Sequence, residues 1–215
     1  MTKLPALLVL LLAAGILLPG CWSSHELTRW GFVQAAAIDL GKNGQLQLTV
    51  QIYRAGSSKG GAGGGGSPAQ QTKSGPSFIN IQTSSSTVHG ATRDAVLQLG
   101  RRLQWSHMRM LLLGEDIARS QNIPQILDYF SRNNEPRGTV SLLITEGEAQ
   151  QYLNLRPLIE GTMGQQLKTI EQNSFRYSGK TMEVSLTDVG IQAADDTPVY
   201  TIPFASIDKK RISSR

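Results

Sequence analysis

The stretch GFVQAAAIDLGKNGQLQLTVQIYR, residues 31–54, decides the fold of this chain. Its first part, 32–40, is apolar with short side chains, and its last part, 45–54, alternates between polar and apolar residues. Alternation with a period of two is typical of a strand that buries one face, and Asn43 and Gly44 between the two parts favour a tight turn. The stretch therefore predicts a β-hairpin. In its second strand we expect a buried face of Leu46, Leu48, Val50 and Ile52 and an opposite, polar face of Gln45, Gln47, Thr49 and Gln51.

Strand-like and helical patterns alternate along the rest of the chain. Strands are expected at 78–83, 107–113 and 139–145, with short segments or strands at 181–187 and 199–204. Helices are expected after a cap at Ser86 or Thr87, after a cap at Asn122, at 146–153, and at 159–170. Gly161 and Gly164 are expected to weaken the last of these helices. The pattern favours an α+β fold, in which a mixed or antiparallel sheet has helices packed on it.

A glycine-rich segment at 55–77 is expected to be a flexible insertion, because nothing in it can form a core. Residues 61–66 formally match the G-x-G-x-x-G pattern of dinucleotide-binding sites. Such a site also needs a strand directly before the pattern, a helix after it and an acidic residue about 20 positions further on. Pro68 follows instead, and no Asp or Glu occurs between Tyr53 and Asp94. We therefore expect no nucleotide site here.

The N-terminus is typical of a bacterial lipoprotein. A positive charge precedes an apolar run at 4–18, which is shorter than the roughly 20 residues of a membrane-spanning helix. The Leu-Pro-Gly-Cys sequence at 18–21 matches a lipobox, the site where a signal peptide is cleaved before a lipid-modified cysteine. We expect residues 1–20 to be the signal peptide and the thiol of Cys21 to carry a diacylglycerol. Residues 21–30 should form the lipid-anchored tether and the start of the domain.

Lipid attachment implies an exported protein that is held on the outer face of a membrane. The alternative is an uncleaved anchor with an incidental cysteine, but Cys21 is the only cysteine in the chain. In that compartment nucleic acid, ATP and NAD are scarce, so we expect no nucleic-acid partner and none of these cofactors.

The composition excludes several other classes of protein. The 215 residues carry 21 Lys+Arg and 16 Asp+Glu, and the resulting charge of +5 suits an anionic membrane surface better than nucleic acid. A single Cys excludes internal disulfides and a cysteine-based zinc site. The three histidines, His25, His89 and His107, lack the spacing of metal ligands. We therefore expect no metal and no cofactor.

No catalytic site is expected either. Ser206 and Lys209 match the S-x-x-K pattern, but the S-D-N and K-T-G sequences that accompany it in β-lactamases are absent. Asp195 and Asp196 are adjacent, which is typical of a solvated turn. His107 has no nucleophile or carboxylate partner in the sequence, so we expect a structural, hydrogen-bonding role for it.

Arg132, Glu135 and Arg137 form the candidate contact group, in a polar connection at 132–137. Two guanidinium groups and a carboxylate on an exposed connection could dock a partner subunit through paired hydrogen bonds. The alternative is a solvated loop with a local salt bridge that contributes about 0–1 kcal/mol. Arg101, Arg102 and the basic run at 209–211 could contact anionic lipid, with a solvated face as the alternative.

Short motifs occur along most of the chain. The first are Cys21-Trp22, Glu26-Leu27, Phe32-Val33 and Ile38-Asp39. The later ones are Ser106-His107, Leu113 to Ala118, Asn122-Ile123, Leu127-Asp128, Arg132-x-x-Glu135-x-Arg137 and Thr145 to Leu153. In their order and spacing they resemble the Ger(x)C family, the C-subunit lipoproteins of spore germinant receptors. The resemblance spans residues 18 to about 204.

The resemblance implies a non-catalytic receptor subunit on the outer face of the cell or spore inner membrane. It also implies assembly with integral-membrane A and B subunits in nutrient-triggered germination. Family members are usually much longer, so we expect 31–204 to be the N-terminal domain and 205–215 a basic tail before missing domains. Two other interpretations stay open, a free-standing extracytoplasmic solute-binding lipoprotein and, with less support, an envelope hydrolase.

Overall fold

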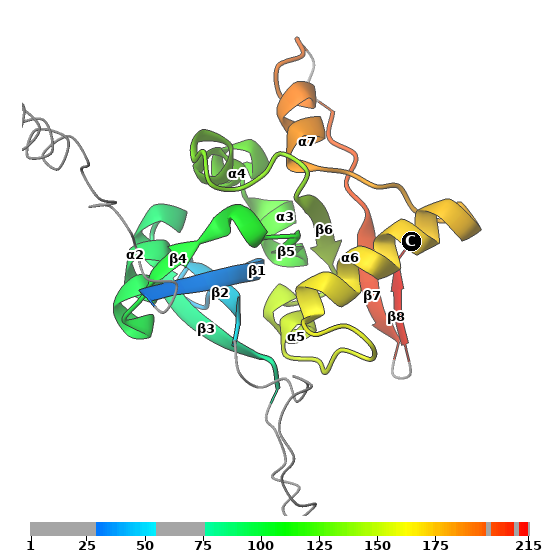
Figure 1. Cartoon of the computed structure of the whole chain (residues 1–215). Coiled ribbons are helices and arrows are strands. Elements are labelled where there is room, and N and C mark those ends of the chain that lie inside the picture. Colours follow the sequence, from blue (N-terminus) through cyan, green and yellow to red (C-terminus); the bar gives the residue numbers. More distant parts are fainter. Residues whose placement is uncertain (1–28, 55–75, 197–198, 209–210, 215) are drawn as a thin grey trace, which may run out of the picture.

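A mixed sheet of eight strands forms the centre of the protein in the computed structural model (Figure 1). Helices pack on this sheet, which confirms the α+β class predicted from the sequence. The structure describes residues 29–54, 76–196, 199–208 and 211–214. The predicted signal peptide, Cys21 and positions 55–75 of the predicted flexible insertion lie outside the described residues.

The strands follow the order β3-β2-β1-β5-β6-β7-β8 across the sheet, and β4 pairs with one end of β1. The strands are β1 (Trp30–Leu40), β2 (Leu46–Tyr53), β3 (Phe78–Ser85), β4 (Arg102–Gln104), β5 (Met110–Gly114), β6 (Ser141–Thr145), β7 (Phe204–Asp208) and β8 (Arg211–Ser214). The α-helices are α2 (Val88–Leu99), α3 (Glu115–Ser120), α4 (Ile123–Arg132), α5 (Ala149–Leu153), α6 (Met163–Asn173) and α7 (Leu186–Gln192). A short 3-10 turn, η2 (Trp105–His107), precedes β5, and a π-helical turn, η3 (Ser174–Ser178), follows α6.

The predicted hairpin is present as β1 and β2, which pair antiparallel. Gly44 adopts a φ of 72° in the turn, a conformation that suits glycine. The Gly41 amide donates to the Gln45 carbonyl at 2.8 Å and closes the turn. β3 then pairs antiparallel with β2, so the first three strands form one antiparallel end of the sheet.

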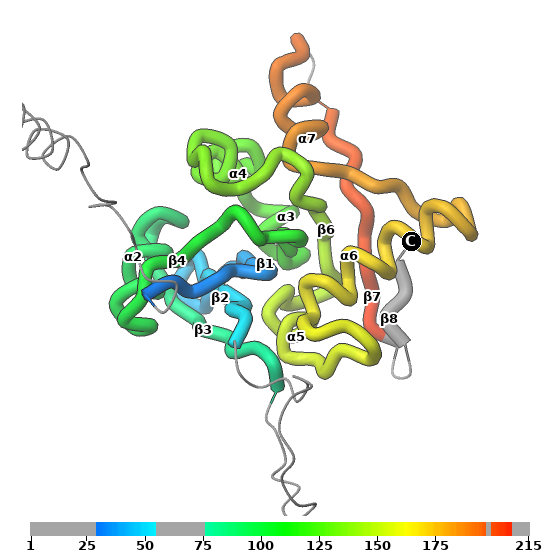
Figure 2. The backbone as a smooth tube through the Cα atoms, viewed as in Figure 1, coloured from blue at the N-terminus to red at the C-terminus, as the bar shows by residue number. Residues whose placement is uncertain are grey.

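β1 lies in the interior of the sheet and is paired along both of its edges. β2 pairs with one edge, while β4 and then β5 pair parallel with successive parts of the other. Figure 2 shows the blue backbone of β1 beside the green backbone of β4, which comes much later in the chain. The strand predicted to begin at His107 begins at Met110 instead, because η2 turns the chain between β4 and β5.

Helices cover both faces of the sheet, so the protein has two hydrophobic cores. On one face α2, α4 and α7 pack over alternate strand residues that include Ile38, Leu48, Val50, Leu111 and Leu113. On the other face α5 and α6 pack over Ala35, Ala37, Met110, Leu112 and Leu143. Parallel strands joined by helical connections are commonly covered on both faces. The second half of β2 is covered on both faces as well, although its pairing is antiparallel, because Gln51 lies under α5 and α6. The prediction that β2 buries only one face is wrong for this half.

Gln51 shows how the face of β2 that we expected to be exposed is accommodated under the helices. Its side chain is 0% exposed, and its Oε1 accepts a hydrogen bond from the Gly164 amide at 2.9 Å. Its Nε2 lies 3.1 Å from the Leu153 carbonyl and 3.2 Å from Asn80 Oδ1 and donates to both. A buried amide side chain needs such partners. Gln51 thus joins β2 to the end of α5 and the first turn of α6.

The helix boundaries follow the predicted capping signals in part. Thr87, one of the two expected caps, accepts a hydrogen bond from the Gly90 amide at the start of α2. Asn122 precedes α4 at the predicted position, although its side chain makes no capping hydrogen bond. The helix expected from Ile159 begins only at Met163, because Thr162 provides the cap and Ile159 lies in the preceding loop with 90% of its surface exposed.

The predicted domain boundary at residue 204 needs correction. β7 begins at Phe204 and pairs parallel with β6, and β8 pairs antiparallel with β7. Ala205 is buried in the second core. Residues 205–208 and 211–214 therefore belong to two strands of the sheet and not to a tail.

Candidate functional site

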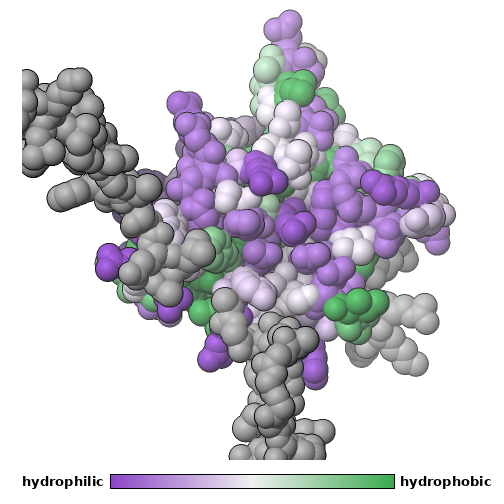
Figure 3. Space-filling model, in the orientation of Figure 1, coloured by the Kyte–Doolittle hydropathy of each residue, from purple (hydrophilic) through white to green (hydrophobic). Residues whose placement is uncertain are grey.

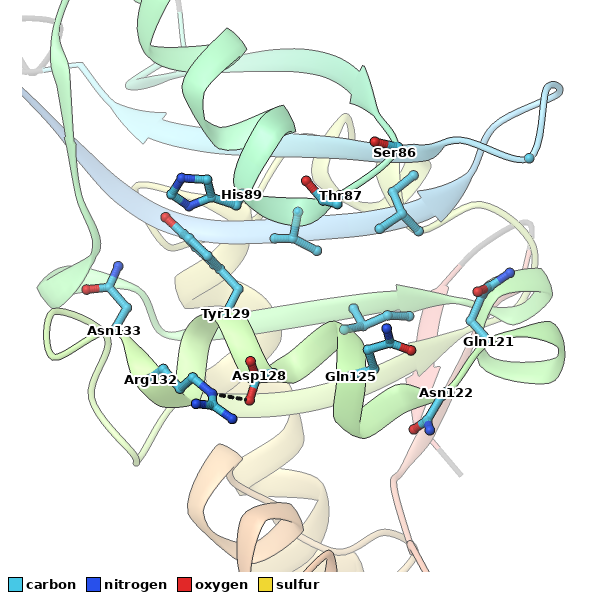
Figure 4. Close-up of a pocket in the computed structure, with 14 residues that line it drawn as sticks. Ser86, Thr87, His89, Gln121, Asn122, Gln125, Asp128, Tyr129, Arg132 and Asn133 are labelled. Carbon is cyan, nitrogen blue, oxygen red and sulfur yellow. Dashed lines mark hydrogen bonds and ion pairs between the residues drawn. The ribbon is translucent and has the colours of Figure 1, made fainter.

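A polar cavity of about 620 Å³ lies between the β1–β2 turn, the start of α2 and α4 (Figure 4). This volume is within the range of small-molecule sites, about 300–1,000 Å³. His89 from α2 and Tyr129 from α4 lie close together on one side of the cavity, with ring centroids 5.8 Å apart. Gln121, Asn122 and Gln125 lie on the other side.

An aromatic cluster fixes the wall of the cavity on the side of α4. The ring of Tyr129 makes edge contacts with Phe130 at 5.1 Å and with Trp105 at 6.2 Å between centroids. Trp105 and Phe130 are almost completely buried. Edge-to-face packing of this kind restricts ring orientation and adds to the area that is buried. The cavity is therefore lined by the ring of Tyr129, whose orientation is fixed by this packing, and by amide and hydroxyl groups. Such a lining suits a polar solute.

The charged residues of the cavity balance one another. Arg132 Nε lies 2.6 Å from Asp128 Oδ1, one turn earlier in α4, and the pair is drawn in Figure 4. Both side chains are at least half exposed. Exposed pairs of this kind contribute little to stability because water screens their charges.

The three residues of the predicted contact group have separate surroundings. Arg132 pairs with Asp128 in the polar cavity. Glu135 Oε2 accepts a hydrogen bond from the Trp105 amide at 3.3 Å, so this carboxylate holds the turn η2. Arg137 lines a different cavity, at the amino ends of β5 and β6. No salt bridge within the group is present among the described residues, and its role in partner docking stays a prediction.

A second cavity, of about 390 Å³, lies at the amino ends of the parallel strands β5 and β6. Residues just before β5 contribute His107 and Arg109, and the connection before β6 contributes Arg137. Lys168 on α6 and Glu183 complete its charged lining. The ring of His107 packs edge-on against Phe32, with centroids 5.4 Å apart. His107 therefore makes an aromatic contact, and no hydrogen bond of its side chain occurs among the described residues.

Lys168 lies at the centre of a charged cluster that the sequence patterns did not indicate. Its Nζ donates to Glu183 Oε1 at 2.6 Å and to the hydroxyl of Ser141, and it lies 3.8 Å from Glu171 Oε2. Gln172 Nε2 also donates to Glu183, at 3.0 Å. The hydrogen bond from Lys168, together with that from Gln172, lowers the pKa of Glu183. Glu183 is therefore a well-satisfied carboxylate.

Glu171 is the member of this cluster whose carboxylate lacks hydrogen-bond partners among the described residues. It is 1% exposed, and within the described part of the chain neither carboxylate oxygen accepts a hydrogen bond of normal geometry. Burial raises the pKa of Glu171 to about 7, against the opposing effects of Ser141 and the charge of Lys168. A buried carboxylate with so little compensation favours its neutral form.

We expect Glu171→Gln to remove part of the pH dependence of folding stability. The folded pKa of Glu171, about 7, lies above the ordinary value of 4.5. The contribution of Glu171 to stability is therefore fully present below about pH 4.5 and is lost as the pH rises through 7. At pH 8 the variant should be more stable than the wild type, on the order of 3 kcal/mol. Urea denaturation at pH 5 and pH 8 measures the difference.

Glu146→Gln is the matched control, because Glu146 is exposed and lies outside the cluster. This control should leave the pH dependence unchanged. An equal gain in both variants, or no gain at pH 8 for Glu171→Gln, would contradict the raised pKa of Glu171.

Asp39 is a second buried carboxylate, at the end of β1. Its two oxygens accept hydrogen bonds from the Ala149 and Gln150 amides, at 2.6 Å and 2.9 Å, so it holds the first turn of α5. Burial raises the pKa of Asp39, and the two amide hydrogen bonds only partly offset this effect. Gly114 lies against the carboxylate, where a Cβ atom would collide with it. An Asp at the end of an apolar strand is the only signal of this role in the sequence, and it is a weak one because Asp is also common in the exposed turns that follow strands.

In the ranges that the structure describes, no helix is both long and apolar enough to cross a membrane. Within the same ranges, no three His, Cys, Asp or Glu side chains come together as a group that could hold a metal ion.

Comparison with known proteins identifies the family of this domain. The family described as "Spore germination protein N-terminal domain" matches residues 23–207 of the chain. The chain belongs to this family. The match contains strands β1 to β6 and all but the last residue of β7, so the family's domain corresponds to the sheet and its helices. The resemblance found in the short motifs is thereby confirmed.

Curated relatives from Bacillus subtilis (strain 168) carry names of the same kind. The chain is 28% identical over 212 residues to spore germination protein KC, covering 96% of the chain and 51% of that relative. It is 29% identical over 171 residues to spore germination protein YndF, covering 72% of the chain and 42% of that relative. It is 28% identical over 130 residues to spore germination protein B3, covering 60% of the chain and 32% of that relative. The chain thus spans about half the length, or less, of these relatives, and no solved structure matches it.

Proposed function

We propose that this protein is a non-catalytic lipoprotein subunit of a spore germinant receptor. The observation that carries the proposal is the family match over residues 23–207, nearly all of the described fold. Relatives named as spore germination proteins support a role in germination. In this proposal the subunit assembles with two integral-membrane subunits and acts in the response to nutrients.

The proposed location is the outer face of the cell or spore inner membrane. Residues 1–20 serve as the signal peptide, and Cys21 carries a diacylglycerol that anchors the mature chain. Two or more acyl chains hold a protein on a bilayer much more firmly than a single chain. The fold starts within ten residues of Cys21, because β1 begins at Trp30. The domain therefore sits close to the bilayer, within reach of membrane subunits.

Co-purification from spore inner membrane tests the proposal. The full chain is solubilised in detergent and captured, with Cys21→Ala as the comparison. We expect two integral-membrane proteins to be captured with the wild type, and less of both with Cys21→Ala, which lacks the anchor. Capture of the wild-type chain alone would count against the subunit role.

The polar cavity favours a second candidate, a free-standing solute-binding lipoprotein. Its volume of about 620 Å³ and its amide and hydroxyl lining suit a small polar solute. A solute binder is stabilised by its ligand in the absence of any partner. A rise in melting temperature of the isolated chain with a small polar solute, combined with capture of no membrane protein, would favour this second candidate.

The contact group provides a separate prediction about receptor assembly. We expect the double variant Arg132→Glu and Arg137→Glu to reduce capture of the membrane subunits, because charge reversal at an interface introduces repulsion. Arg93→Glu with Arg156→Glu is the control, since it makes the same charge change at exposed positions elsewhere. Normal capture by a folded Arg132→Glu, Arg137→Glu protein would remove these arginines from the interface.

A further inference from the structure

The second cavity has an excess of positive charge that its own carboxylate does not neutralise. It lies at the amino ends of β5 and β6, and its lining includes Arg109, Arg137, Lys168 and Glu183. Lys168 and Glu183 are bound to each other at 2.6 Å, so their charges cancel locally. Figure 3 shows a mainly hydrophilic surface over this part of the molecule, between α4 and α6.

The guanidinium groups of Arg109 and Arg137 carry the positive charge that is not neutralised in this cavity. Among the described residues, neither of them forms an ion pair or a side-chain hydrogen bond, and both side chains lie at the exposed rim of the cavity. The cations of the neighbouring helices do have partners, since Arg132 of α4 pairs with Asp128 and Lys168 of α6 pairs with Glu183. Two arginines without counter-ions in one concave site repel each other, and an anion between them would relieve that repulsion.

The backbone holds both arginines in place, although their side chains are free. The Arg109 amide donates to the Gln34 carbonyl at 2.9 Å, and the Arg109 carbonyl accepts from the Ser141 amide at 3.0 Å. The Arg137 carbonyl accepts from the Val140 amide at 3.1 Å. Binding an anion therefore requires ordering of the two side chains and no rearrangement of the sheet, which limits the entropic cost.

Hydroxyl groups complete the set of donors. Ser106 and Thr139 also line the cavity. Ser106 Oγ accepts a hydrogen bond from Gln104 Nε2 at 3.0 Å, which leaves the proton of its own hydroxyl available for another acceptor. A guanidinium group presents parallel N–H donors that match the two oxygens of a carboxylate or of a phosphate.

We propose that this cavity binds a small oxyanion, a carboxylate or a phosphate, between the guanidinium groups of Arg109 and Arg137. The volume of about 390 Å³ fits a small molecule. The ion pair of Lys168 and Glu183 also lines the cavity. This site is distinct from the polar cavity next to α4 and does not depend on the proposed role in a receptor.

Calorimetric titration of the full chain in detergent micelles tests the site. Sodium phosphate and sodium succinate are titrated separately at constant ionic strength, so the two titrations distinguish phosphate from carboxylate. We expect saturable binding of at least one of them. The double variant Arg109→Gln and Arg137→Gln should bind that anion at least about tenfold more weakly, because hydrogen bonds to charged groups are strong.

Arg93→Gln with Arg156→Gln is the matched control, because it removes the same charge from exposed positions outside the cavity. The control should keep the affinity of the wild type, and circular dichroism should show that both variants are folded. Saturable binding that is lost only in the cavity variant supports the site. Equal weakening in the control, wild-type affinity in the cavity variant, or no saturable binding of either anion would overturn it.

Discussion

Replacing Gly164 with alanine is expected to lower the free energy of unfolding by about 2 kcal/mol, because the new methyl group has no space. Gly164 lies in the first turn of α6, directly against β1. A Cβ atom there would lie 2.7 Å from the Cβ of Ala35 and 2.7 Å from the carbonyl oxygen of Gln34. The second contact is with backbone in the interior of the sheet, which cannot move aside without disturbing its neighbours.

Helix propensity works in the opposite direction, which makes the result informative. Alanine is favoured over glycine in a helix by about 1 kcal/mol, so propensity alone predicts stabilisation. Gly190→Ala is the matched control, because Gly190 lies inside α7 and a Cβ there would have no atom within 4 Å. Urea denaturation should show a clear loss of stability for Gly164→Ala and no loss, or a small gain, for Gly190→Ala. A Gly164→Ala protein as stable as the wild type would show that α6 does not lie as close to β1 as the structure indicates.

Asp39→Ala should destabilise the protein by about 3 kcal/mol, because it leaves one buried and one partly buried amide without an acceptor. These amides belong to Ala149 and Gln150 in the first turn of α5. Asp39 is itself 2% exposed, so water cannot easily replace its carboxylate. The loss should appear in urea denaturation, and hydrogen exchange should show the amides of α5 less protected.

Asp39→Asn separates the shape of this side chain from its function as an acceptor. Asparagine keeps one acceptor oxygen and places an NH2 group against the other amide, so we expect an intermediate loss. Asp188→Ala provides the comparison at an exposed helix start, where Asp188 accepts from the Ser185 amide at 2.8 Å in a capping box. The loss there should be smaller, since water can solvate the exposed amide. Equal losses for Asp39→Ala and Asp188→Ala would contradict the special role of the buried carboxylate.

The elements that could be predicted are those with local signals. The hairpin of β1 and β2 has both an alternating pattern and a turn sequence, and α2 has its cap at Thr87. The burial of Gln51 could not be predicted in this way. Its position in an alternating strand indicates a polar face, and only the later packing of α5 and α6 covers that face.

The neighbours of the charged residues could not be predicted from the sequence either, because tertiary packing determines them. Lys168, Glu171 and Glu183 come together from α6 and the segment after it, and a helix with Lys and Glu usually exposes them to solvent. The glycine expected to weaken the same helix, Gly164, instead permits its close approach to β1. Arg132, Glu135 and Arg137 are close in sequence, but the end of α4 and the turn after it give each of them different neighbours.

The position of β1 also has a mechanical consequence. If Cys21 is the lipid anchor, as proposed, any pull between membrane and domain enters the fold at Trp30, the first residue of β1. An edge strand would peel away one hydrogen bond at a time under such a load. β1 is paired with β2 on one edge and with β4 and β5 on the other, so a force along it must shear several ladders at once. With that anchor, the tether leads into a strand that neighbours hold on both edges, which favours transmission of force from the bilayer into the domain.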